Sequence, residues 1–313
     1  MNTSWDDYLP HLNKQKAALD QLRPFPPAAL KRLHEQMVIE WTYNSNAIEG
    51  NTLTLKETAL VLQQGITIAG KPLREHLEAV NHREAIQKLE EIVQKKGSLS
   101  EESVRSLHRI IFKGIDDAEA GQWRRERVRI LGAVHLPPDP IKVPRLMEEF
   151  THWLVKEEPK AHPVWFAGMA HHRFVHIHPF IDGNGRCARL LMNLLLMRGG
   201  FPPAVILKVD RPKYYRFLQQ ADQNEYDNYL RFIARSVERS LALYLHTLAP
   251  STTKTYQKQG YISLAEAARG TPYNQEYLSL LARRGILHAV KFQRNWLTTH
   301  DAVREYIAEH GVK

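Results

Sequence analysis

The chain has 313 residues, a formal net charge of +9 and a single cysteine, Cys187. A chain of this length can bury a sizeable core and is expected to form two domains, or one large domain with an appendage. One cysteine excludes an intramolecular disulfide framework. With no signal-like start and no apolar run of bilayer length, the sequence favours a soluble cytoplasmic protein without a membrane partner. The positive charge favours anionic partners but does not by itself indicate nucleic acid.

Apolar residues at helical spacing predict a mostly helical chain. In the first half, the predicted helices cover residues 28–49, 54–64, 76–95 and 101–112. The last of these is expected to open with a capping box formed by Ser98 and Glu101. In the second half, the predicted helices cover residues 145–156, 164–177, 187–198, 213–220 and 227–248. The helix at 187–198 is apolar on almost every side, so we expect it at the centre of the bundle.

Two segments interrupt this pattern. Between residues 121 and 140, the β-prone stretch VRILGAV and three following prolines predict a β-hairpin flap. After residue 248, a polar stretch without apolar periodicity predicts a linker. We therefore expect an N-terminal helical region at 1–97, a helical core at 98–248, a linker at 249–260 and a small module at 261–313.

The stretch HPFIDGNGRCAR, from His178 to Arg189, places glycines and two arginines at the start of a helix. Cations are disfavoured there, because the helix dipole is already positive at its N-terminus. Gly183 and Gly185 allow a tight turn that points backbone N–H groups at an anion, and Arg186 lies on the same helical face as Arg189. A bound polyphosphate would explain both arginines, since guanidinium groups bind phosphate in a fork.

Two neighbours complete this predicted site. Pro179 disfavours helical geometry at His178, so the helix is expected to end there with the imidazole facing the loop. Asp182 offers a hard oxygen ligand beside the anion, which is how proteins usually hold Mg²⁺. Each feature alone is structural more often than functional, because GNG is a common turn and arginines pair with carboxylates. Their combination within one short stretch favours a nucleotide site.

The stretch resembles, without a departure at its defining positions, the HxFx(D/E)GNGRxxR signature of Fic-domain proteins. Similarity to the branch that includes the animal endoplasmic-reticulum enzyme runs from Trp41 to near Thr247. The resemblance implies an all-α Fic helical bundle with a β-hairpin flap, and transfer of AMP from ATP to a protein hydroxyl. In that reading, His178 is the general base and titrates near the working pH.

The resemblance also implies roles for the remaining signature residues. Asp182 would hold Mg²⁺, and Gly183, Asn184 and Gly185 would line the anion hole. Arg186 and Arg189 would bind and orient the ATP phosphates.

Three further elements follow from the same resemblance. The flap segment Leu131, Gly132, Ala133 and Val134 would dock the target backbone as an added strand. Tyr215 would contact the base or ribose, although a tyrosine pair on a helix is often core packing. Relatives carry an Asn where this chain has Asp222, which leaves the preferred base open.

Glu49 ends its predicted helix, where a carboxylate is disfavoured by the dipole. A solvated surface Glu is the ordinary interpretation. The surrounding SNAIEGN, however, resembles the (S/T)xxxE(G/N) inhibitory motif of Fic proteins, with Ser45, Glu49 and Gly50 at its defining positions. The resemblance implies that Glu49 pairs with Arg189 and leaves ATP in an unproductive pose. In some relatives the same Glu positions water for removal of AMP.

Other histidines and the cysteine have weaker signals. HHRFVHIH, with His171, His172, His176 and His178, lacks a zinc-type pattern, so His171 and His172 are interpreted as packing or hydrogen-bonding residues. Cys187 lies at a helix start near arginines, which can lower a thiol pKa, but no nucleophile context surrounds it.

The module at 261–313 is predicted as helix, turn, helix, short strand pair and helix, and is similar to excisionase or MerR-type winged helices. A recognition helix is expected at 275–283 and a wing, anchored by Trp296, at 290–297. A DNA-facing patch would consist of Arg283, Arg284, Lys291 and Arg294. The module has only two more basic than acidic residues, so a protein-binding or dimerising role is equally favoured.

The interpretation that these features favour is an autoinhibited protein adenylyltransferase, with ATP as co-substrate, Mg²⁺ as cofactor and a protein target that includes the chain itself. Removal of AMP, alone or together with its transfer, is the alternative enzyme. A DNA-binding regulator that uses the core as a nucleotide sensor is the non-enzyme alternative. The resemblance also implies a homodimer that associates near Leu73.

Overall fold

The structure, a computed structural model, describes residues 5–95, 97, 99–130, 133–249, 260–292 and 295–310. These residues are mostly helical, with one small three-stranded sheet. They form two compact units: one comprises the described residues of Met1–Asn13 and His34–Val237, and the other those of Lys14–Leu33 and Glu238–Lys313. Within the described ranges, no helix has both the length and the apolar character needed to cross a membrane. The domain boundaries drawn from the sequence stay predictions.

Most of the predicted helices are confirmed to within a few residues. The helices up to residue 112 are η1 (Trp5–Tyr8), α1 (Leu9–Asp20), α2 (Pro27–Ile48), α3 (Leu55–Gln64), α4 (Leu73–Lys95) and α5 (Glu101–Phe112). Those that follow, up to residue 248, are η2 (Pro140–Lys142), α6 (Val143–Glu157), α7 (Pro163–Ile177), α8 (Asn184–Arg198), η3 (Lys208–Asp210), α9 (Arg211–Asp222) and α10 (Asp227–Leu248). Only α1 and the short 3₁₀ turns lack a sequence prediction.

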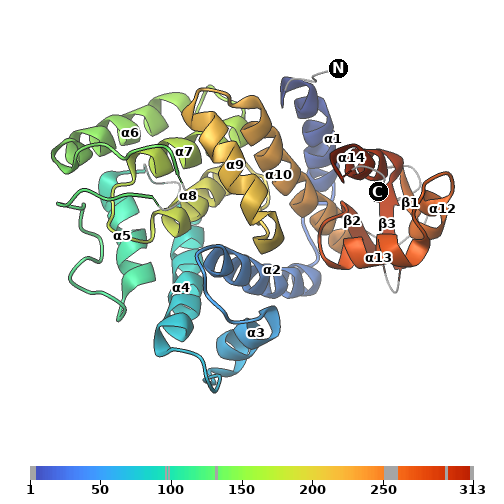
Figure 1. Cartoon of the computed structure of the whole chain (residues 1–313), viewed down its shortest axis with the longest axis horizontal. Coiled ribbons are helices and arrows are strands. Elements are labelled where there is room, and N and C mark those ends of the chain that lie inside the picture. Colours follow the sequence, from blue (N-terminus) through green and yellow to red (C-terminus); the bar gives the residue numbers. More distant parts are fainter. Residues whose placement is uncertain are drawn as a thin grey trace. The chain divides into compact units, whose positions relative to one another are not determined.

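Helix α8 lies at the centre of the first unit, as its apolar sequence predicts. It packs against α7, α4 and α5 (Figure 1). Leu190, Leu194 and Leu196 have no exposed surface, and the helix ends at Gly199, where a Cβ atom would lie 2.4 Å from Pro163. This tight packing fixes the first turn of α8, and with it the loop that precedes the helix.

The cap of α5 differs from the prediction. Ser100 is the N-cap, and its side chain accepts a hydrogen bond from the backbone N–H of Ser103. The Ser103 side chain in turn accepts a hydrogen bond from the backbone N–H of Ser100. The capping box therefore joins Ser100 to Ser103, and Glu101 takes no part in it. Ser98, the predicted cap, lies outside the described residues.

The predicted β-hairpin is wrong for the described part of its segment: residues 121–130 and 133–139 contain no strand. Arg124 organises this segment instead. Its buried guanidinium donates to the carbonyls of Glu126 (3.0 Å), Pro138 (2.5 Å) and His178 (2.7 Å). These bonds satisfy carbonyl groups that would otherwise accept hydrogen bonds from a neighbouring strand. The nearby prolines have no N–H group to donate to such a strand. Leu131 and Gly132 lie outside the described residues.

The second unit holds the sheet. Strands β1 (Tyr261–Ser263), β2 (Ala289–Phe292) and β3 (Asn295–Thr299) are antiparallel in the order β1-β3-β2. The other elements of this module are α12 (Leu264–Ala268), α13 (Gln275–Arg283) and α14 (His300–His310). Leu278, Leu287 and Val303 are central to its small core, and Trp296 packs against that core. The predicted order of two helices, a strand pair and a helix is observed, but β1 precedes it and was not predicted.

Candidate functional site

His178 ends helix α7 in a left-handed conformation, with φ 51° and ψ 60°. Such a backbone is rare for a residue with a side chain and is typical of functional sites. Its Nδ1 lies 3.2 Å from the carbonyl of Val175. A carbonyl only accepts, so Nδ1 carries the proton and Nε2 has the free lone pair. Burial lowers the pKa of His178 to about 4, which is below the working range expected from the sequence and keeps the ring neutral at pH 7.

The loop between α7 and α8 is braced from inside. The Asn184 side chain accepts from the Phe180 N–H (2.9 Å) and donates to the Phe180 carbonyl (2.8 Å). Both the oxygen and the nitrogen of this amide therefore bond to the loop itself and hold its shape. Gly183 has φ +77°, and a Cβ atom there would lie 2.4 Å from Phe112. Glycine is required at this position for both reasons.

The Glu49 carboxylate lies against Gly185 in the first turn of α8. A Cβ atom on Gly185 would be 2.2 Å from Glu49 Oε1, so the space that glycine leaves is the space that the carboxylate fills. An acidic group at a helix N-terminus is favoured by the dipole. In this structure, a carboxylate of the chain itself therefore occupies this turn and pairs with Arg189.

Arg189 is held from three directions by the end of α2. Its Nε donates to Ser45 Oγ (3.0 Å), and its Nη2 donates to the Ser45 carbonyl (2.8 Å) and to Glu49 Oε1 (2.8 Å). Its side chain is 3% exposed. Burial opposes the charge of Arg189, but the Glu49 carboxylate keeps the pKa of this guanidinium above its ordinary value. The buried Nη1 has no partner among the described residues.

Arg186 is anchored by a residue that the sequence did not single out. Its Nη1 lies 3.3 Å from Glu78 Oε1, on helix α4, and its guanidinium lies over the Phe112 ring, 5.2 Å from the centroid. Glu78 in turn accepts from Asn51 (2.9 Å). Glu78 reads in the sequence as an ordinary helical glutamate, so only the fold identifies it.

Asp182 is suited to hold Mg²⁺ but is engaged by protein groups here. Oδ1 accepts from the Gly183 N–H (2.6 Å), and Oδ2 pairs with Arg74 Nη2 (2.9 Å). Both charged side chains are more than half exposed, so Arg74 can move away at small cost. One exposed carboxylate next to a phosphate site fits the usual Mg²⁺ arrangement, in which the phosphates supply further ligands.

Tyr215 and Tyr214 close another side of the site. Tyr215 is partly buried with Arg211 4.8 Å from its ring centroid, and burial raises the pKa of its phenol. Tyr214 is buried, and its hydroxyl contacts His171 Nε2 at 2.8 Å. His171 also contacts Tyr229 at 2.8 Å, which confirms His171 as a packing and hydrogen-bonding residue.

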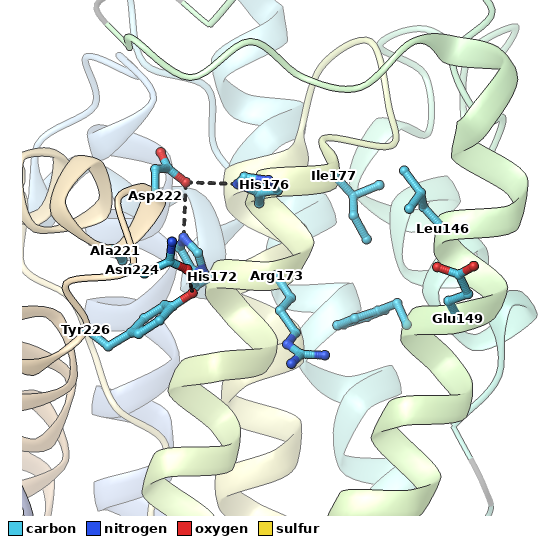
Figure 2. A pocket seen from close by; sticks show the side chains of 11 residues that line it. Leu146, Glu149, His172, Arg173, His176, Ile177, Ala221, Asp222, Asn224 and Tyr226 are labelled. Carbon is cyan, nitrogen blue, oxygen red and sulfur yellow. Dashed lines mark hydrogen bonds and ion pairs between the residues drawn. The ribbon is translucent and has the colours of Figure 1, made fainter.

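Asp222 ends α9 next to the last turns of α7. Its Oδ1 accepts from His172 Nε2 and from His176 Nδ1, each at 3.0 Å (Figure 2). Burial would raise the pKa of Asp222, but these two hydrogen bonds hold it below its ordinary value. Asp222 and both histidines line a cavity of about 290 Å³ that also touches Leu146 on α6 and Tyr226.

Cys187 is not an activated thiol. It is buried in the first turns of α8, and burial raises its pKa to about 12 despite the nearby arginines. The alternative of a lowered pKa is therefore wrong, since desolvation of the thiolate outweighs the attraction of the two cations.

The remaining predicted residues belong to the flap segment and to the second unit. Ala133 and Val134 come directly after residues 131–132, which are not among the described residues. Val134 is 82% exposed. In the second unit, the side chains of Arg283, Arg284 and Lys291 are exposed, while Arg294 lies outside the described residues.

Comparison with known proteins agrees with this geometry. The Fic/DOC family model matches residues 98–196. The chain is 42% identical over 219 residues to protein adenylyltransferase Fic from Drosophila grimshawi, which covers 70% of this chain and 45% of that protein. The chain thus spans about half the length of the curated relatives it matches.

Solved structures show the same fold. Fic-1 from C. elegans superposes with a TM-score of 0.70 and 31% identity, over 77% of this chain and 71% of that one. A Fic domain containing signaling protein from Bacteroides thetaiotaomicron superposes with a TM-score of 0.73 and 29% identity, over 77% of this chain and 97% of that one. A helical bundle of the kind seen in these Fic structures is the class of protein that the fold defines. The chain belongs to the Fic/DOC family.

Proposed function

We propose that this chain is a protein adenylyltransferase that transfers AMP from ATP to a hydroxyl group of a protein, itself included. The observation that carries the proposal is the orientation of His178. Its protonated Nδ1 is directed to Val175, and its Nε2 has no hydrogen-bond partner among the described residues. The ring lies directly before a turn that contains two buried arginines. The names of relatives that are about 40% identical support the same activity.

The proposed reaction needs few groups. Nε2 of His178 takes the proton of the target hydroxyl while its oxygen bonds to the α-phosphorus. The bond from that phosphorus to the bridging oxygen breaks, and pyrophosphate leaves. Arg186 and Arg189 bind the phosphates and align this displacement, together with the backbone of Gly183 and Gly185. Bound at Asp182, Mg²⁺ would neutralise phosphate charge.

We further propose that Glu49 inhibits this reaction. Its carboxylate fills the space at Gly185 and takes the Nη2 donor of Arg189, so the terminal phosphate of ATP and Glu49 compete for one position. Displacing the carboxylate frees a buried cation, and that cation then favours a phosphate oxygen. Ser45 holds Arg189 in the same place in either case.

The test is labelling of the chain with ATP that carries a radioactive α-phosphate. We expect Glu49→Gly to label itself at least about tenfold faster than wild type, because Arg189 is freed and a negative charge is removed. Glu119→Gly, which removes a partly exposed glutamate from the turn after α5, is the control and should match wild type. Adding His178→Ala to Glu49→Gly should abolish labelling while ATP binding persists. Undiminished labelling would remove His178 from the mechanism, and no gain with Glu49→Gly would remove the inhibition.

Removal of AMP is a second candidate because the Glu49 carboxylate stays in the site, 32% exposed and thus able to orient water. Protein labelled by Glu49→Gly, purified and returned to wild type without ATP, should lose AMP only if this activity exists. Mass spectrometry of a lysate treated with Glu49→Gly and ATP would identify the transferred group and the target peptide.

We also propose that the C-terminal module is a winged helix. The order β1, α12, α13, β2, β3 and α14, with exposed Arg283 and Arg284 at the end of α13, supports this. Leu280 on the same helix is 40% exposed, which favours a protein surface as much as DNA. Salt-dependent retardation of DNA by the whole chain, lost in an Arg283→Ala/Arg284→Ala variant, would select DNA. A homodimer through exposed Leu73 on α4 is proposed on the resemblance alone.

A further inference from the structure

One cluster of potential metal ligands lies outside the phosphate site. It consists of His135, in the segment before η2, His176, in the last turn of α7, and Asp222, at the end of α9. One ligand atom from each residue lies within 4.8 Å of the other two. Among the residues that the structure describes, this is the one such group of three.

We propose that His135, His176 and Asp222 bind a divalent transition-metal ion, with Zn²⁺ as the best match. Two imidazoles with one carboxylate are a donor set that suits Zn²⁺ and its neighbours in the first transition row. Mg²⁺ and Ca²⁺ prefer sets made of oxygen, so the site would discriminate against the ion expected at Asp182.

The spacing is close to what the ion needs. Ligand atoms around a tetrahedral Zn²⁺ lie about 3.3 Å apart, given bonds of about 2.0–2.1 Å. His176 Nδ1 and Asp222 Oδ1 are already 3.0 Å apart. His135 must approach by about 1.5 Å at most to complete the set, and its place on a segment without helix or strand makes this movement easy.

The hydrogen bonds around the cluster already orient the ligands. His135 Nε2 lies 2.8 Å from the carbonyl of His176, which only accepts, so Nε2 carries the proton and Nδ1 has the lone pair. Metal-binding histidines commonly donate their other ring N–H to a backbone carbonyl in this way. His172 Nε2 donates to the same oxygen of Asp222, Oδ1, and helps to fix the carboxylate (Figure 2).

Binding also requires a proton shift at His176. His176 Nδ1 now donates to Asp222, so the ion would replace this proton, which moves to Nε2 of the same ring. His176 and Asp222 border the cavity of about 290 Å³, which leaves room for a water molecule as fourth ligand. The bound ion would join the segment of His135 to the ends of α7 and α9, and would therefore order the stretch that precedes the active site.

The test measures metal content and does not depend on AMP transfer. The tag-free full chain is stripped with a chelator, dialysed against ZnCl₂ with excess MgCl₂, desalted and analysed by plasma mass spectrometry. We expect one Zn²⁺ per wild-type chain and a higher melting temperature with Zn²⁺. His135→Ala and Asp222→Asn should each weaken Zn²⁺ binding by at least about tenfold.

The control is His152→Ala, which removes an exposed histidine of α6 and should bind Zn²⁺ like wild type. His135 lies in a loop and Asp222→Asn keeps its shape, so both metal-free variants should melt near wild type. Wild-type Zn²⁺ content in His135→Ala and Asp222→Asn would show that other histidines bind the ion and would overturn the proposal. Absence of Zn²⁺ from the wild-type chain would overturn it as well.

Discussion

Replacing Glu49 by Gln tests whether the ion pair with Arg189 is closed in solution. The change keeps the shape of the side chain but removes its charge, and so leaves a guanidinium that is 3% exposed without a counterion. Breaking a fully buried pair costs about 3–5 kcal/mol, and an exposed pair is worth at most about 1 kcal/mol. Because Glu49 is 32% exposed and Ser45 still binds Arg189, we expect a loss of about 1–2 kcal/mol.

That loss corresponds to a decrease in melting temperature of about 2–8 °C for a unit of this size. The assay is thermal unfolding with and without MgATP. Saturating ATP should raise the melting temperature of Glu49→Gln more than that of wild type, because wild type must first displace its own carboxylate. Glu119→Gln serves as the control for loss of a glutamate charge. Equal melting temperatures for Glu49→Gln, Glu119→Gln and wild type without ATP would refute a closed pair.

Three further outcomes are expected. In the Glu49→Gly background, labelling should be flat from neutral pH down to about pH 5 and fall as pH approaches 4, because burial holds the His178 pKa near 4 and protonation removes the base; a midpoint near 6.5 would contradict this. Asn184→Ala should lower the free energy of unfolding by about 2–3 kcal/mol in urea, since two backbone groups of Phe180 lose their partner; an unchanged midpoint would show that water replaces the amide. Native Cys187 should react with a thiol reagent at least about tenfold more slowly than in the unfolded chain, given its raised pKa; equal rates would place it at the surface.

Helix α8, the end of α7 and the turn between them could be predicted from the sequence. The apolar run of α8 and the proline after His178 specify a buried helix, a helix end and the turn between them, because each depends on neighbours in sequence. The ends of α10 were predicted to the residue. The contact of Glu49 with Arg189 came from a resemblance, since 140 residues separate the two.

The errors and omissions have a common cause, which is that tertiary partners leave no local signal. Glu78, which anchors Arg186, is an unremarkable helical glutamate until α4 packs beside α8. The flap segment has β propensity, but Arg124 takes its carbonyls. The cluster of His135 with Asp222 spans three parts of the chain that only the fold brings together.

Because Gly185 has no side chain, the Glu49 carboxylate can lie against the first turn of α8. Under the proposed inhibition, this has a quantitative consequence. The Glu49 carboxylate would compete with the terminal phosphate of ATP. Because Glu49 belongs to the same chain, its local concentration is fixed and dilution cannot lower it. A pair worth about 1–2 kcal/mol would weaken productive nucleotide binding by about 5–30-fold, whatever the amount of protein. Partners that shift α2 by a fraction of a turn would then act as activators without touching the nucleotide.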